Sequence, residues 1–258
     1  MIGLIYFMVI VVANAIGAIS GMGGGVLIKP VLDLFGFHSV AAISFYSTVA
    51  VFTMSIVSTI RQLKNGVRIN WPVLGWVSFG AVIGGFLGNS AFEGLLLLYE
   101  KESTVQIIQI VLTVATLLFA LLYSKNQWRQ YDFKYQGSFL LCGLFLGFLA
   151  SLLGIGGGPI NVSLLMLLFS LPIKEATVYS IGTIFFSQLS KLLTIAFSSG
   201  FGRYDLSLLL FIVPAAIVGG FMGAKFSKVL SEERVTTVFQ LVIVVVLLIN
   251  LFNGWKLM

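Results

Sequence analysis

Two glycine-rich stretches offer the clearest chemistry in this sequence. The first, GMGGG, covers residues 21–25, and the second, GIGGGP, covers residues 154–159. A glycine cluster disfavours helix because an ordered glycine loses the most backbone freedom and buries no side chain. We therefore expect the chain to unwind at both places. A helix should restart directly afterwards, where Pro159 suits the first helical position.

Free backbone donors at these helix starts indicate an anion site. A glycine loop lets a ligand approach its N–H groups, and a helix start adds about half a positive charge. We predict that the two loops face each other across one pocket for a small anion. The competing interpretation is that the glycines only permit close helix packing, as small residues do in membrane bundles. The predicted backbone donors belong to Gly23, Gly24, Gly25, Gly156, Gly157 and Gly158.

Two lysines inside apolar segments are candidate charged partners of this anion. Lys29 follows the first glycine stretch, and Asp33 lies four residues later on the same helical face, so the two could instead form an ion pair. Lys191 lies in an apolar segment over residues 176–198. It could extend its ammonium group to the membrane surface, or face the bundle beside Gln188 and attract the anion. Both alternatives stay open for each lysine.

Neutral polar side chains near the second glycine stretch complete the predicted site. Asn161 and Ser163 follow it directly, and Gln188 lies near Lys191. Amides and hydroxyls can replace water around the oxygens of a small anion, although each could instead bond to a neighbouring helix backbone. The apolar segments contain no carboxylate pair, catalytic triad or metal-ligand cluster. We therefore predict no enzyme activity, no cofactor and no metal.

The composition identifies the class of protein that must position these residues. The chain has 258 residues, of which 59% are hydrophobic and only 9% are charged, whereas a soluble domain has about 25% charged residues. Long apolar runs recur from end to end, so we predict an all-α polytopic membrane protein in contact with the lipid bilayer. The net charge of +6 needs no nucleic acid. The predicted segments cover residues 2–20, 26–37, 40–60, 71–90, 104–123, 137–153, 159–170, 176–198, 206–224 and 235–252.

Three landmarks recur in the same order and indicate an internal duplication. Gly21 and Gly154 are 133 positions apart, as are Tyr46 and Tyr179, and the GGFLG at residues 84–88 matches a GGFMG starting 135 positions later. Chance similarity between glycine-rich helices is the alternative. The duplication divides the chain into a first membrane repeat at 1–125, a cytoplasmic linker at 126–135 and a second membrane repeat at 136–258.

Five segments in each half place the two repeats in opposite orientations, and the basic residues favour this arrangement. If the N-terminus is outside, ten lysines and arginines fall inside and three fall outside, which agrees with the positive-inside rule. The inside set is Arg61, Lys64, Arg68, Lys125, Arg129, Lys134, Lys174, Lys225, Lys228 and Arg234. The two 12-residue segments would span only about 18 Å of a ~30 Å core, so we expect half-helices or crossings completed by loop.

These motifs resemble the sulfite exporter TauE/SafE family, also called TSUP. One G-x-G-G-G motif in each half, the duplication and the paired GGFxG segments carry the resemblance over nearly the whole chain. The resemblance implies an inner-membrane transporter, more often an exporter, of sulfite or a small organosulfur anion. The anion would lie between the two glycine loops, with alternating access by movement of one repeat against the other. A passive anion channel and a non-transporting membrane scaffold or subunit are the alternatives.

Overall fold

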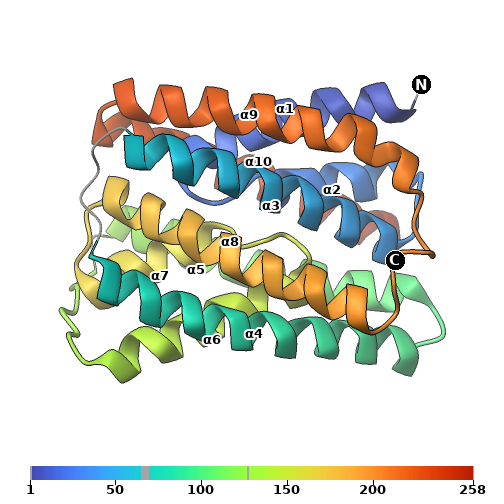
Figure 1. Ribbon diagram of the computed structural model, residues 1–258, viewed down its shortest axis with the longest axis horizontal. Coiled ribbons are helices and arrows are strands. Elements are labelled where there is room, and N and C mark those ends of the chain that lie inside the picture. The colour runs from blue at the N-terminus through green and yellow to red at the C-terminus, as the bar shows by residue number, and fades with distance from the viewer. Residues whose placement is uncertain (1, 65–69, 127, 258) are drawn as a thin grey trace.

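The computed structural model describes residues 2–64, 70–126 and 128–257. Over these residues the chain forms ten α-helices and one short 3-10 helix, and no β-strand. The helices lie side by side in one bundle, with both chain termini at the same end (Figure 1). The prediction of an all-helical protein is therefore confirmed.

The helices follow one another with short connections. The first five are α1 (Ile2–Ser20), α2 (Gly25–Phe35), α3 (Val40–Lys64), α4 (Trp71–Leu98) and α5 (Glu102–Asn126). The rest are α6 (Gln136–Leu153), α7 (Pro159–Phe169), α8 (Ile173–Phe197), η1 (Leu206–Leu208), α9 (Leu209–Val229) and α10 (Glu232–Leu257). Eight spans in the described chain are long and apolar enough to cross a membrane. Helices α2 and α7 have 11 residues each, or about 16 Å, which is too short to cross alone.

Glycine conformation explains why the chain leaves the helix before α2 and α7. Gly21 and Gly154 have φ values of +74° and +67°, and Gly23 and Gly156 have +76° and +70°. Residues with a side chain rarely adopt these left-handed conformations. The equivalent glycines therefore make the same turn in both halves, and Pro159 is the first residue of α7.

Small residues allow the long helices to pack closely. Helix α4 lies against α6, and α9 lies against α1. A Cβ added to Gly84 of α4 would come within 2.7 Å of the Phe148 main-chain nitrogen. A Cβ on Gly223 of α9 would come within 2.7 Å of Ala18 Cβ. Close backbone approach of this kind holds membrane helices together, since lipid tails are as apolar as the side chains.

Basic residues divide unequally between the two ends of the bundle. The last residues of α3, α5, α7 and α9 and the first residues of α4, α6, α8 and α10 lie at the end opposite to the termini (Figure 1). Nine of the ten basic residues predicted to lie inside belong to these helix ends or to the described residues between them, and Arg68 lies outside the described residues. The other end carries Lys101, Arg203 and Lys256.

Candidate functional site

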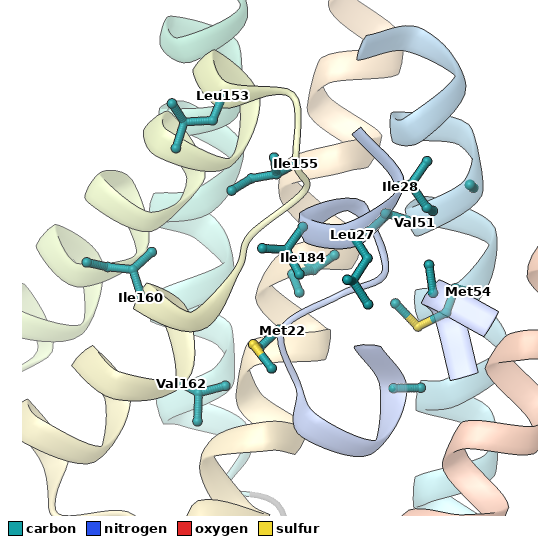
Figure 2. Packing of buried hydrophobic residues seen from close by; sticks show 14 of the residues in the cluster. Met22, Leu27, Ile28, Val51, Met54, Leu153, Ile155, Ile160, Val162 and Ile184 are labelled. Carbon is teal, nitrogen blue, oxygen red and sulfur yellow. The ribbon is translucent and has the colours of Figure 1, made fainter. Parts of the chain in front are cut away.

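The two glycine loops meet at the centre of the bundle. The Gly158 N–H donates a hydrogen bond to the Met22 carbonyl oxygen at 2.8 Å. Figure 2 shows the connection between α1 and α2 beside the connection between α6 and α7, with Met22, Ile155 and Ile184 packed around them. Segments more than a hundred residues apart in the sequence thus form one contact.

Each loop has the same internal hydrogen bond. The Gly23 N–H donates to the Gly17 carbonyl at 3.3 Å, and the Gly156 N–H donates to the Ala150 carbonyl at 3.3 Å. Both donors and both acceptors are 133 positions apart in the sequence. The first turn of each loop is therefore built in the same way, although the loops differ afterwards, with a φ of −67° at Gly24 and +137° at Gly157.

Several amide groups of these loops have no hydrogen-bond partner in the protein. Among the described residues, the N–H groups of Gly24, Gly25 and Val26 make no hydrogen bond to protein, and neither does that of Gly157. All four residues are buried, so bulk water does not reach them. Unpaired buried N–H groups at a helix start are suited to binding an anion.

The glycines also serve close packing. A Cβ on Gly24 would come within 2.9 Å of Asn14 Cα, and a Cβ on Gly25 would lie 2.9 Å from Ser47 Oγ. Gly157 has a φ of +137°, and a Cβ there would lie 2.8 Å from the Ile184 side chain. Close packing and free amide groups therefore occur at the same glycines.

Buried polar side chains without partners surround the loops. Each belongs to a residue that is at most 1% exposed. An unsatisfied buried polar atom costs about 1–3 kcal/mol, and native structures usually pair such atoms with protein, water or ligand. The unpaired atoms near the loops or on the helices that carry them are Asn14 Oδ1, Ser47 Oγ, Ser151 Oγ, both amide atoms of Asn161, Ser163 Oγ and Gln188 Oε1.

Two of these amides belong to the predicted site and lie against the second loop. The Asn161 Nδ2 atom lies 3.1 Å from the place that a Cβ on Gly157 would occupy. The Gln188 Cδ atom lies 3.4 Å from the place that a Cβ on Gly156 would occupy. The structure thus brings these side chains to the predicted backbone donors. Ser163 is buried on α7 with its hydroxyl unpaired.

Lys29 forms the ion pair that its spacing allowed. Its Nζ atom lies 2.7 Å from Asp33 Oδ2, and both side chains are only 4% exposed. The Lys29 side chain also reaches the second loop, because its Cε atom lies 3.4 Å from the position of a Cβ on Gly154. The pair is therefore part of the central region and not a surface contact.

Lys191 faces the interior of the bundle and does not extend to the membrane surface. Its Nζ atom donates hydrogen bonds to Ser44 Oγ at 2.8 Å and to the Ser151 carbonyl at 2.9 Å. The ammonium group also lies 5.2 Å from the centre of the Phe92 ring. Within the described residues, no carboxylate oxygen lies within 4.0 Å of this nitrogen.

Ser44 and Gly154 connect the two lysines. Ser44 accepts from Lys191, and its Oγ atom is 2.5 Å from the position of a Cβ on Gly154, the residue that also contacts Lys29. Sequence reasoning did not single out Ser151, which takes part through its main-chain carbonyl. A carbonyl is present at every residue, so the side-chain pattern carries no signal for it.

Equivalent contacts flank the site toward both ends of the bundle. At the end with the termini, Tyr46 Oη accepts a hydrogen bond from the Asp205 N–H at 3.1 Å. At the opposite end, Tyr179 Oη accepts from the Asn70 N–H at 2.7 Å. Arg203 adds an ion pair with Glu93 at the first end. Hydrogen bonds from Ser207 hold the pKa of Asp205 below its usual value.

Comparison with known proteins places the chain among membrane transporters. A sequence model of the family described as "Sulfite exporter TauE/SafE" matches residues 6–250. The probable membrane transporter protein MJ0441 of Methanocaldococcus jannaschii is 25% identical over 236 residues, which cover 86% of this chain and 85% of the relative. The probable membrane transporter protein YunE of Bacillus subtilis is 26% identical over 263 residues, covering 91% of this chain and 92% of the relative. No solved structure matches the chain significantly.

Proposed function

Because the chain belongs to the sulfite exporter TauE/SafE family, we propose that it carries sulfite or a small organosulfur anion out of the cell across the bacterial inner membrane. Eight candidate spans in the described chain support its place in a membrane. Both relatives are also named as membrane transporters.

The unpaired polar groups at the glycine loops carry this proposal. Free N–H groups at Gly24, Gly25 and Gly157, the unpaired Asn161 Nδ2 and the second N–H of Gln188 Nε2, whose first bonds to Ser187 Oγ, lie in a region closed to bulk water. An anion with several oxygen atoms would satisfy many of these donors at once, whereas a packing site would need none of them. We propose that the anion binds between the two loops.

Two inverted repeats would explain how this site opens to each side in turn. If α1–α5 correspond in order to α6–α10, then α4 is equivalent to α9 and α6 is equivalent to α1. The α4–α6 contact and the α9–α1 contact are then equivalent, and both are extensive. Helix α1 begins at the end with the termini, and α6 begins at the opposite end (Figure 1). We propose that residues 1–125 and 136–258 are these repeats. The basic end would face the cytoplasm, in agreement with the positive-inside rule.

The two tyrosine contacts are suited to alternating access. Tyr46 with Asp205 and Tyr179 with Asn70 occupy equivalent places at the two ends. The glycine loops between them are buried, so an anion could enter or leave only after a movement at one end. Releasing one contact while the other holds would expose the site to one side only, which separates a transporter from a passive channel.

The amide side chains allow a direct test of the binding site. The Asn161 amide makes no hydrogen bond to protein, and the Gln188 amide nitrogen bonds only to the neighbouring Ser187 hydroxyl, which leaves its second N–H free for a ligand. Asn161→Ala and Gln188→Ala should therefore preserve folding. Each should weaken binding of sulfite or methanesulfonate about tenfold, since a hydrogen bond to a charged group contributes roughly 1.5–3 kcal/mol. Binding is measured by the thermal shift of purified protein.

Thr183→Val is the matched control, since Thr183 is buried on α8 and donates only to the Tyr179 carbonyl of its own helix. Unchanged affinity in both amide variants, or an equal loss in the control, would refute the proposed site. Flux in liposomes then separates the mechanisms, because only a coupled transporter accumulates anion against its gradient. Anion binding without any flux would favour a scaffold or subunit.

A further inference from the structure

We propose that the central site is charge-matched to a single negative charge and therefore prefers compact monovalent oxyanions to divalent ones. This inference rests on the proposed function, because it assumes that the anion between the two glycine loops also lies close to Lys29 and Lys191. It adds the charge of the substrate, which neither the family nor the relatives specify. A sulfonate group with one charge is the class of ligand that it selects.

Counting the buried charges leads to this conclusion. Lys29 and Asp33 neutralise each other through their 2.7 Å ion pair. Lys191 is 1% exposed and, among the described residues, has no carboxylate partner. The ion pair of Glu93 and Arg203 is neutral as a unit and partly exposed. The three buried charges therefore sum to one positive charge, that of Lys191.

The helix ends do not change this count. Each glycine loop joins the end of one helix to the start of the next, α1 to α2 and α6 to α7. A helix end carries about half a negative charge and a helix start about half a positive charge, so the two largely offset within each loop. Lys191 itself bonds to the Ser151 carbonyl, in the last turn of α6.

Low dielectric makes the charge balance decisive for affinity. A buried charge without a partner is costly, and a partner of opposite charge removes most of that cost. A monovalent anion beside Lys191 makes the region neutral, whereas a divalent anion leaves one uncompensated negative charge. The closed glycine loops keep out the water that would otherwise screen this excess.

Methanesulfonate and sulfate are suitable probes because they have similar oxygen groups and fixed charges near neutral pH. Thermal shift titrations of the purified full chain give the affinity for each. We expect the native protein to bind methanesulfonate more tightly than sulfate. Asp33→Asn adds one positive charge to the region and should move the ratio of the two affinities toward sulfate by about tenfold or more.

A charge-balanced double variant is the control. Lys29→Gln with Asp33→Asn removes both members of the pair without changing the net charge, so it should keep the native preference. If Asp33→Asn does not fold, Lys191→Met and Lys191→Arg replace it. The first should weaken binding of both anions and increase the preference for methanesulfonate, because sulfate would then leave two uncompensated charges, and the second should retain the native preference.

The outcomes separate this inference from the proposed function. A native protein that binds sulfate as tightly as methanesulfonate, or an Asp33→Asn variant with an unchanged ratio, overturns the charge inference and leaves the anion site standing. A native protein that binds neither anion, and does not bind sulfite, overturns both.

Discussion

Replacing Lys29 by methionine should strongly destabilise the protein, even without a ligand. The substitution keeps a long apolar side chain but removes the partner of Asp33, which lies 2.7 Å away with only 4% of its side chain exposed. The second carboxylate oxygen of Asp33 has no hydrogen bond. The variant therefore leaves an uncompensated carboxylate in the interior.

The expected magnitude follows from this burial. Breaking a buried pair by removing one partner costs about 3–5 kcal/mol, whereas replacing both partners by apolar residues is often neutral. For a protein of this size, 1 kcal/mol corresponds to roughly 2–4 °C in melting temperature, so the loss should be on the order of 10 °C. Adding Asp33→Leu should recover most of it.

Melting of the purified protein in detergent micelles, followed by loss of monodisperse material, measures this effect. Lys134→Met is the matched control, because its ion pair with Asp132 is 3.0 Å long but 82% and 60% exposed. It should change the melting temperature little. A single variant as stable as the native protein, or a double variant as unstable as Lys29→Met, would contradict the reasoning.

Two further predictions concern helix packing and orientation. Gly84→Ala should lower the melting temperature because its Cβ would meet the backbone of α6. In Gly75→Ala, a control in the same helix, the added Cβ meets nothing within 4 Å, so this change should raise stability by about 0.5–1 kcal/mol. Equal effects of the two changes would refute the packing argument. A cysteine at Ser231 should react with impermeant reagents only from the cytoplasm and one at Ser103 only from outside, and labelling of Ser231 from outside would contradict the proposed orientation.

The glycine pattern largely determined the local structure before any tertiary contact was known. Glycines at 21 and 154 supply left-handed turns, and Pro159 begins α7. These features are local, because they depend on which backbone conformations a residue without a Cβ can adopt. The apolar runs likewise identified the helices, since a bilayer requires long stretches without charge.

Only the tertiary structure decided how the lysines are used. The four-residue spacing of Lys29 and Asp33 allowed an ion pair or a ligand contact, and the structure shows the pair formed. The direction in which Lys191 points depends on α3 and α6, which supply Ser44 and the Ser151 carbonyl. No periodicity within α8 contains that information.

The meeting of the two loops also depends on the whole bundle. Each glycine stretch forms its turn locally, but the contact between Gly158 and Met22 joins the two halves of the chain, which pack together through helix contacts such as α4 on α6 and α9 on α1. Whether a buried polar side chain finds a partner is decided at the same level. Ser180 does, on the Gly21 carbonyl, while Ser47, its equivalent 133 positions earlier, has none, because partners come from helices distant in the sequence.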